Sequence, residues 1–580
     1  MKLELQKGSR SRILAVLVLG VMAVFVVRLF YLQVIQHGYY SNLADNEQIK
    51  RLTIPAKRGL IYALDGDKPP VQLVMNETIY TVFADPQTTK DDSKIVDVIR
   101  RIAGGNARAD LSGLLARKDS RYQILATKIT RTQADKIKQE GLRGIGFQQE
   151  SQRVYPEGSL AAQTLGFVDF SGNGRYGVEG KLNDRLLGRD GLLQSVTDVS
   201  DVPLTIGNRN INKPAVDGEN IVLSIDRNVQ SYVDQALAAG LKRTGATNGS
   251  VMVMDPQSGK IMAMANFPTY KPAEFNKVED GEVFNNGTIS KPYEPGSVIK
   301  TLTVATGIDK GVITPQSTYV NTDLITIGGE QIRNATKGQT GTITIQHALN
   351  WSLNTGMVTV AQRLGDGTSI NRSARDIMYD YFYNKFGLGQ FSGIELSGEA
   401  SGIVWSPEAL EGNAVRYSNM SFGQGMDLTM VQVCSAFSSI VNGGKYYKPT
   451  VLAGVVDTSG TYKPRLTQPL RTTISPSTSA QVKEMTRTAR AMVNQGIDRP
   501  GYVIGGKTGT SEVPDKNGGY LENETVGTYL GYGGEDAPAY VIMIQVSGKN
   551  VLLQGGRDAM PIFADISNWM IDYLKLQPKG

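Results

Sequence analysis

The feature that most constrains this chain is an apolar run near its N-terminus. "ILAVLVLGVMAVFVV" fills residues 13–27, and "LFYLQVI" continues the run past Arg28 to Ile35. At about 1.5 Å per residue, a helix of this length spans the roughly 30 Å hydrocarbon core of a bilayer. The sequence therefore predicts a transmembrane helix over residues 13–36, with Arg28 near one end, where it snorkels or meets a partner helix.

The flanking charges predict which way this helix crosses the membrane. Basic residues precede the run, at Lys2, Lys7, Arg10 and Arg12. The positive-inside rule places residues 1–12 in the cytoplasm and everything after about residue 37 outside the membrane. A cleaved signal peptide is the alternative, but the run is too long for one and no A-x-A site follows it. We therefore expect an uncleaved anchor.

Composition narrows the function classes. The chain has 580 residues, enough for two or more domains, and a mild net charge of +6 with interspersed signs, which does not indicate nucleic-acid binding. Its one cysteine, Cys434, excludes an internal disulfide and a cysteine-rich metal site, and is expected to be a buried small apolar residue. With only His37 and His347, a zinc site is disfavoured, and a Ser-His-Asp triad would need His347. A serine nucleophile would need another base.

The middle of the chain alternates between strand and helix patterns. Short β-type runs follow the anchor, residues 86–145 are typical of polar, charged helices, and residues 155–182 return to strands and glycine turns. Residues 205–220 are predicted to be a linker. No catalytic constellation lies in residues 37–215, so we interpret them as a β-rich pedestal and interaction domain.

Residues 216–580 are predicted to form one large α+β domain. Residues 249–268 form two apolar runs around an Asp-Pro-x-x-Gly turn, typical of a hairpin. Helical patterns cover residues 297–310, 343–364, 427–443 and 560–576, and strand patterns cover 501–510, 528–534 and 539–548. We expect an antiparallel sheet made from both ends of the domain, with helices packed on it.

Three short motifs occur in order within this domain. Ser297-x-x-Lys300 starts a helical pattern, and Lys507-Thr508-Gly509-Thr510 ends a strand pattern. Ser352-x-Asn354 lies inside a second helical pattern, in which Asn354 and Gly356 suggest a break. An N-cap serine beside a solvated lysine is the alternative for the first motif. Taken together, the ordered motifs are typical of penicillin-binding proteins and class A β-lactamases.

A nucleotide-binding loop is the alternative for residues 501–508. "GYVIGGKT" matches G-x-x-x-x-G-K-[ST], but a phosphate loop must be followed by a helix. Tyr502, Val503 and Ile504 are typical of a strand, and "GTSEVPDKNGGY" cannot begin a helix. The sequence therefore predicts a strand here and no nucleotide.

The chain resembles the class B penicillin-binding proteins, the monofunctional peptidoglycan DD-transpeptidases, over nearly its whole length. The resemblance rests on "KRGLIYALDG", "YGVEGKLNDRLLGRDG", "YEPGSVIK", "LNWSLNTG", "SFGQGMDLTMVQVCSAFSSIVNGG" and "GGKTGT". The glutamate of "YEPGS" favours the cell-division type over the elongation type. The resemblance implies an anchor, a pedestal or dimerisation domain (37–215), and a transpeptidase domain (216–580) with a sheet and an all-helical subdomain.

The resemblance also implies the roles of the motif residues. Ser297 would attack a D-Ala-D-Ala stem peptide, with Lys300 as base, Ser352 as proton relay and Asn354 as an amide holder. Lys507 would supply charge near the substrate carboxylate, with Thr508, Gly509 and Thr510 binding substrate. The backbone amides of Ser297 and Thr510 would form the oxyanion hole.

Partners and alternative functions follow from the same resemblance. We expect stem peptides as substrates, β-lactams as inhibitors, and a membrane-spanning glycan polymerase and other divisome proteins as partners, with no metal, cofactor or nucleic acid. An elongation-type transpeptidase, a DD-carboxypeptidase and a β-lactam-sensing receptor remain alternatives, since all share the acyl-serine chemistry. The anchor and pedestal disfavour a small secreted β-lactamase.

Overall fold

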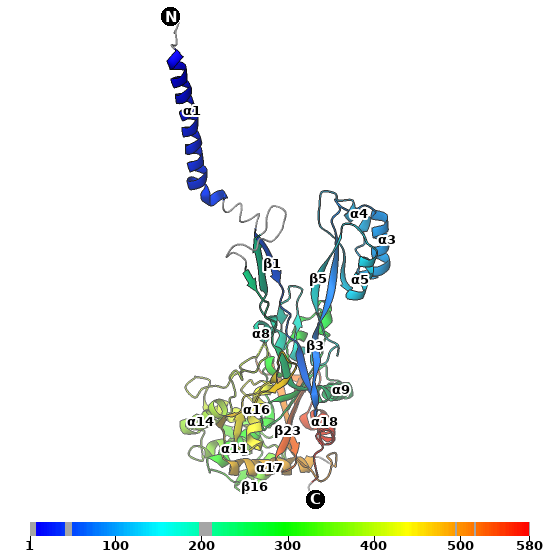
Figure 1. Ribbon diagram of the computed structural model, residues 1–580. Helices are drawn as coiled ribbons and strands as arrows, with labels where there is room; N and C mark the ends of the chain where they lie inside the picture. The colour runs from blue at the N-terminus through cyan, green and yellow to red at the C-terminus, as the bar shows by residue number, and fades with distance from the viewer. Residues whose placement is uncertain (1–6, 41–48, 197–210, 494–495, 516–517, 579–580) are drawn as a thin grey trace. The chain divides into compact units, whose positions relative to one another are not determined.

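The computed structural model describes residues 7–40, 49–196, 211–493, 496–515 and 518–578 (Figure 1). Residues 1–6 of the predicted cytoplasmic tail and residues 205–210 of the predicted linker lie outside this set. The chain divides into two compact units. The first joins Met1–Lys57 to Gly188–Gly218, and the second joins Arg58–Leu187 to Glu219–Gly580.

The first unit contains the apolar helix and a small antiparallel sheet. Helix α1 (Lys7–Phe30) continues into the π-helical turn η1 (Tyr31–Ile35), and its apolar side chains are exposed, as the sequence predicted. The sheet consists of β1 (Ile49–Ile54), β8 (Gly191–Val196) and β9 (Ile211–Lys213). The linker prediction is wrong at β9, because these residues pair with β8 instead of forming open chain.

In the second unit, strands from both sides of residue 215 share one sheet. Its order is β19-β18-β10-β2-β3-β4, with β5 also paired to β3. Strand β10 (Asn220–Asp226) runs parallel to β2 (Ile61–Asp65) and antiparallel to β18 (Leu452–Val456). The other strands are β3 (Lys68–Ala84), β4 (Gln123–Thr130), β5 (Ile145–Val154) and β19 (Tyr462–Pro464). The domain boundary near residue 215 stays a prediction.

Three helices cover one face of strands β3, β4 and β5 (Figure 1). They are α3 (Asp92–Ala103), α4 (Leu111–Leu115) and α5 (Arg131–Gln139). The helices were predicted, but β4 was missed, because "QILATKIT" places three apolar residues in succession and lacks clean alternation.

A five-stranded antiparallel sheet forms the centre of the C-terminal part of the chain, with the order β12-β11-β23-β22-β21. The hairpin of β11 (Asn248–Met254) and β12 (Ile261–Phe267) joins three strands from the far end of the sequence, β21 (Val503–Pro514), β22 (Tyr520–Gly534) and β23 (Pro538–Ser547). Strand β11 makes the junction by pairing with β23. This confirms the predicted sheet built from both ends of the domain. Strand β21 lies at its edge.

Alternation along these strands separates two apolar cores. Val251 and Ile542 face α9 (Arg227–Thr244) and α18 (Met560–Tyr573), whereas Met252 and Met543 face the helical subdomain. Figure 1 shows α9 and α18 on one side of β23, with α11 and α16 on the other. The main helices of that subdomain are α11 (Lys300–Asp309), α13 (Asn354–Arg363), α16 (Met430–Val441) and α17 (Pro476–Val493). Cys434 is buried in α16.

Shorter elements connect these parts. Before the hairpin they are η2 (Gly104–Asn106), α6 (Ala162–Leu165), β6 (Phe167–Val168), β7 (Gly174–Arg175), α7 (Gly177–Lys181) and α8 (Asn183–Leu187). After it they are η3 (Pro272–Lys277), η4 (Gly281–Phe284), α10 (Gly287–Ser290), η5 (Gly296–Ile299), β13 (Thr318–Asn321), β14 (Leu324–Ile327), β15 (Glu330–Arg333), β16 (Gly341–Thr344), α12 (Ile345–Asn350), α14 (Arg372–Tyr379), η6 (Asp380–Lys385), α15 (Ala414–Met420), β17 (Lys445–Tyr447), β20 (Pro469–Thr472) and η7 (Gly555–Ala559).

Candidate active site

Ser297 lies in a tight turn that leads directly into a buried helix. The turn η5 is a 3-10 helix, and α11 follows it without a break. Pro295 is the N-cap residue of η5 and Ile299 that of α11, so Ser297 lies at neither N-cap position. Ser297 is half-buried, whereas Gly296, Val298 and Ile299 are buried. The turn therefore presents the hydroxyl at the surface of an otherwise closed segment.

Lys300 begins α11, one turn after Ser297, and its side chain is 0% exposed. Its Nζ donates to the Ser352 carbonyl oxygen at 2.5 Å and to Asn354 Oδ1 at 2.7 Å, and it lies 3.2 Å from Ser352 Oγ. Burial, and secondarily the nearby Lys507, hold the Lys300 pKa well below its usual range. The first two sequence motifs thus meet at one amine.

The Ser352 backbone explains how the second motif reaches Lys300. Ser352 has φ +57°, a left-handed conformation that is uncommon for a non-glycine residue. It lies between α12 and α13, so the helix predicted over residues 343–364 is interrupted at residues 351–353. Gly356, which the sequence suggested as part of the break, instead lies inside α13. The interruption lets both the carbonyl and the hydroxyl of Ser352 reach Lys300.

Lys507 approaches Ser352 from the edge strand β21. Its side chain is 4% exposed, and Nζ donates to Ser352 Oγ at 2.9 Å and to the Thr508 carbonyl oxygen at 3.1 Å. Burial lowers the Lys507 pKa to about 7. A side chain with this pKa titrates near neutral pH.

Gly509 allows β21 to lie close to η5, the turn that contains the predicted nucleophile Ser297 (the nucleophile turn). A Cβ at this position would lie 2.8 Å from the Pro295 carbonyl oxygen and 3.1 Å from Val298 Cγ1. Thr510 is adjacent to the same turn, because a Cβ on Gly296 would lie 2.7 Å from the Thr510 carbonyl oxygen. The Thr510 hydroxyl accepts a hydrogen bond from the Gly555 amide at 3.2 Å. The third motif therefore lies against the first.

One predicted contact is not formed. In the part of the chain that the structure describes, Lys300 Nζ makes hydrogen bonds with Ser352 and Asn354 and none with the Ser297 hydroxyl.

The His347 ring forms a hydrogen bond with Gln339 Oε1 at 2.8 Å and gives no support to a histidine-based triad. Among the described residues, no group of His, Cys, Asp and Glu could hold a metal ion.

The sequence interpretation missed the residues that support the nucleophile turn. The Gly296 amide donates to the Gly423 carbonyl oxygen at 3.0 Å, and a Cβ on Gly423 would lie 1.9 Å from the Gly296 oxygen. Glu294, 8% exposed, accepts hydrogen bonds from the Gly425 amide at 2.7 Å and from the Tyr520 hydroxyl at 3.2 Å. Burial raises the Glu294 pKa. The two glycines of "SFGQG", Gly423 and Gly425, were the sequence signal that could have revealed these supporting contacts.

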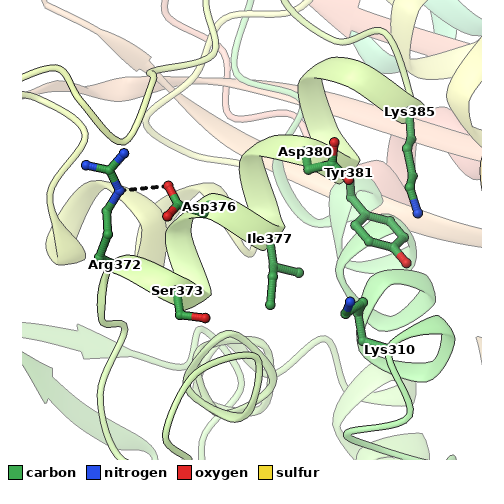
Figure 2. Close-up of a pocket in the computed structure, with 8 residues that line it drawn as sticks. All are labelled: Lys310, Arg372, Ser373, Asp376, Ile377, Asp380, Tyr381 and Lys385. Atoms are coloured by element: carbon green, nitrogen blue, oxygen red, sulfur yellow. Dashed lines mark hydrogen bonds and ion pairs between the residues drawn. The ribbon is translucent and has the colours of Figure 1, made fainter.

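A cavity of about 520 Å³ lies at the opposite end of α11, beside Lys310. Figure 2 shows Arg372 paired with Asp376 at one side of it, and the Lys385 ammonium lies 3.7 Å from the centre of the Tyr381 ring. None of the residues named in the sequence motifs lines this cavity. It is therefore separate from the cluster around Ser297.

The three sequence motifs meet in this cluster, on an α+β domain of a chain that also carries a β-rich part. Residues 249–568 match the penicillin binding protein transpeptidase domain, and residues 53–223 match the penicillin-binding protein dimerisation domain. The chain belongs to the penicillin-binding protein family, and the two matched domains make it a class B member.

Individual relatives agree with this assignment. Stage V sporulation protein D of Bacillus subtilis is 28% identical, covering 98% of this chain and 87% of that protein. Peptidoglycan D,D-transpeptidase FtsI of Escherichia coli is 25% identical, covering 98% and 92%. Penicillin binding protein 2X from Streptococcus thermophilus superposes with a TM-score of 0.74 at 23% identity, covering 91% and 80%, which shows the shared fold. Helix α1 and these relatives indicate a single-pass membrane protein.

Proposed function

We propose that this class B penicillin-binding protein cross-links peptidoglycan stem peptides through an acyl ester on Ser297, during septal wall synthesis. The Escherichia coli relative is a peptidoglycan D,D-transpeptidase, which fits the match to the transpeptidase domain. The observation that carries the proposal is the convergence of Lys300 and Lys507 on the Ser352 hydroxyl.

The state of Lys300 supports its role as the base. A neutral amine has two N–H bonds and one lone pair. The Ser352 carbonyl and Asn354 Oδ1, at 2.5 and 2.7 Å, are acceptors for both N–H bonds. The lone pair is then free to take the Ser297 proton as Ser297 Oγ attacks the carbonyl carbon of the penultimate D-alanine. Burial, which lowers the Lys300 pKa, favours this neutral form.

Ser352 is placed to return the proton to the leaving group. Its oxygen lies 3.2 Å from Lys300 Nζ and 2.9 Å from Lys507 Nζ, so a proton taken by Lys300 has a short path. The C–N bond then breaks, the departing D-alanine takes the proton on its nitrogen, and Ser297 is left esterified.

Asn354 and the threonine motif position the reacting groups. Asn354 Oδ1 holds Lys300, and its Nδ2 donates to the Arg333 carbonyl oxygen at 2.9 Å, which leaves one N–H for a substrate carbonyl. The backbone amides of Ser297 and Thr510 serve as the oxyanion hole, and each such donor contributes roughly 10²–10³ to the rate. The Thr508 and Thr510 side chains, with charged Lys507, bind the substrate carboxylate.

An amine of a second peptide then attacks the ester and forms the cross-link. Water would give a carboxypeptidase instead, with the same acyl-enzyme. Residues 1–12 lie in the cytoplasm and the catalytic domain lies outside the membrane, where the wall is built. The membrane helix and the pedestal meet a glycan polymerase and other division proteins.

Covalent labelling tests this function. Full-length protein is incubated with a fluorescent penicillin, and the label is followed on denaturing gels for an hour. We expect a persistent label that Ser297→Ala abolishes. Ser171→Ala, at an exposed serine outside the three motifs, is the control and should label like the parent. Labelling that survives Ser297→Ala would disprove the proposed nucleophile.

A further inference from the structure

A second concave site lies on the same sheet face as the catalytic motif. It is a groove of about 330 Å³, and the polar side chains of Ser250, Asn266 and Gln545 lie on its sheet side. Tyr293, four residues before the nucleophile, also lines it, as do Lys291 and the carboxylates Asp280 and Glu282. None of the motif residues discussed above lines it. The groove is therefore lined by residues outside the three motifs, and Tyr293 brings it close to the turn that contains Ser297.

Strand register connects this groove to the K-T-G strand. Gly509 pairs with Thr528, Thr528 with Gln545, Gln545 with Ser250, and Ser250 with Asn266. These residues form one row across all five strands, on the face shared with the helical subdomain. At about 4.8 Å per strand, Gln545 lies roughly 10 Å from Gly509. Three extended residues span that distance.

Tyr293 separates the groove from the catalytic strand. Its hydroxyl lies 3.4 Å from Thr528 Oγ1, above the one strand that intervenes between Gln545 and Gly509. Its backbone is fixed on the other side by paired hydrogen bonds with Leu428 at 2.9 and 3.0 Å. A ligand in the groove would therefore reach Ser297 by passing this single side chain.

The lining suits an extended peptide. Ser250 Oγ donates to Asn266 Oδ1 at 2.9 Å, which orders two members of the row, and Gly287 brings α10 close to both. The Gln545 amide makes no hydrogen bond with a described residue, so it has both a donor and an acceptor for a peptide backbone. Lys291 is exposed and forms no ion pair with a described residue, so it is available to a carboxylate.

We propose that this groove binds the acceptor peptide, the amine-bearing second substrate, in an extended conformation with a carboxylate at Lys291. This inference rests on the proposed function. The peptide amine, in its neutral form, attacks the carbonyl carbon of the Ser297 ester. A C–N bond forms, the ester C–O bond breaks, one amine proton passes to the Lys300 and Ser352 pair, and the Ser297 oxygen regains a proton. The groove serves this second step and contributes nothing to acylation.

Partition kinetics test the proposal on the full-length protein in detergent. A thioester substrate acylates Ser297, and the acyl group then goes either to water or to an added amine. Two amines are compared, D-alanine and a synthetic peptide that carries a side-chain amine and a free C-terminal carboxylate. The variants are Gln545→Ala and Lys291→Ala. Their matched controls, Gln235→Ala and Lys242→Ala, lie on α9, which covers the opposite sheet face.

We expect the groove variants to raise the peptide concentration for half-maximal transfer by roughly tenfold or more. Acylation by the thioester, transfer to D-alanine and both control variants should stay within about twofold of the parent. An unchanged peptide dependence would overturn the proposal. So would an equal loss with D-alanine, a parallel loss of acylation, or a parent enzyme that uses D-alanine but shows no saturation with the peptide.

The labelling experiment separates this inference from the function on which it rests. If Ser297→Ala keeps the penicillin label, the proposed function is wrong and the groove has no acyl-enzyme to serve. If Ser297→Ala abolishes the label but Gln545→Ala leaves the peptide dependence unchanged, only the assignment of the groove is wrong.

Discussion

Lys507 Nζ lies 2.9 Å from Ser352 Oγ. Lys300 Nζ lies 3.2 Å from the same oxygen, so one hydroxyl joins two buried lysines from different ends of the domain. Two charged ammonium groups at such a site would repel each other, and among the described residues neither lysine forms an ion pair with a carboxylate. Burial lowers the pKa of both, and the Lys507 charge lowers that of Lys300 further. The arrangement therefore favours a neutral base next to a group that titrates near neutrality.

The first prediction concerns the chemical identity of the base. Lys300→Arg keeps a cation, but arginine stays charged at any working pH and cannot accept the Ser297 proton. We expect this variant to lose penicillin acylation almost as fully as Ser297→Ala, by roughly 10³-fold or more. The measurement is the second-order acylation rate constant, with circular dichroism to confirm folding.

Lys507→Arg is the matched substitution for that experiment. It keeps the positive charge that the proposed role requires, so it should lose much less activity than Lys300→Arg. If Lys300→Arg acylates within about tenfold of the parent, Lys300 is not the base.

The second prediction is a bell-shaped pH dependence of acylation. Below the lowered pKa of Lys300 the base is protonated, so the rate falls towards acid. Above the Lys507 pKa of about 7 the positive charge that attracts the penicillin carboxylate is lost, so the rate also falls towards alkali. Lys507→Arg should remove the alkaline limb and keep the acid limb. An alkaline limb that persists in this variant would assign it to another group.

The main parts of this site were predictable from the sequence because short local patterns specify them. Apolar periodicity predicted the central sheet and its helices, and the motif order predicted that Ser297, Lys300 and Lys507 belong together. The sequence suggested a helix break at Asn354 and Gly356, but the left-handed turn lies at Ser352, where no glycine or asparagine marks it. The burial that lowers the Lys507 pKa is likewise a tertiary property, invisible in "GGKTGT".

The pedestal shows a second kind of limit. β2 and β10 are separated by more than a hundred residues, yet they pair in parallel. A parallel pair needs a long connection, so no local turn signal marks it. A boundary placed from composition near residue 215 therefore could not reveal that strands on its two sides share one sheet.

The third prediction tests the close approach of Gly423 to the nucleophile turn. Gly423 has φ +93°, and a Cβ there would lie 1.9 Å from the Gly296 carbonyl oxygen. Gly443 has nearly the same φ, +91°, but a Cβ there would have no atom within 4 Å. Gly423→Ala should therefore displace the turn and reduce acylation by roughly tenfold or more, whereas Gly443→Ala bears only the backbone strain.

Acylation rates and melting temperatures of the two alanine variants provide the comparison. Both should melt lower than the parent, and only Gly423→Ala should acylate slowly. Equal acylation rates would show that the turn tolerates displacement.

The fourth prediction concerns membrane orientation. The basic residues before the apolar run predict that the transpeptidase domain lies outside the membrane. A C-terminal reporter that is active only in the cytoplasm should give no signal, and one that is active only outside should give full signal. N-terminal sequencing of the mature protein should find residues before residue 13. Mature protein that begins beyond residue 30 would instead indicate a cleaved signal peptide.

The last prediction is that Lys507 makes the folded protein less stable at neutral pH. An unfolded lysine has a pKa near 10.4, whereas burial lowers the folded value to about 7. Between these values the unfolded chain binds a proton that the folded chain lacks, so the free energy of unfolding rises with pH, by up to about 5 kcal/mol. Lys507→Met removes this penalty, and we expect it to melt several degrees higher than the parent at pH 7, with the difference shrinking towards pH 10.

The exposed Lys549→Met is the control and should show no such trend. The same Lys507→Met variant should acylate slowly, because the charge that draws in the substrate carboxylate is gone. A melting difference that is equal at pH 7 and pH 10 would mean that Lys507 is not held partly neutral, and the alkaline limb predicted for acylation would then need another origin.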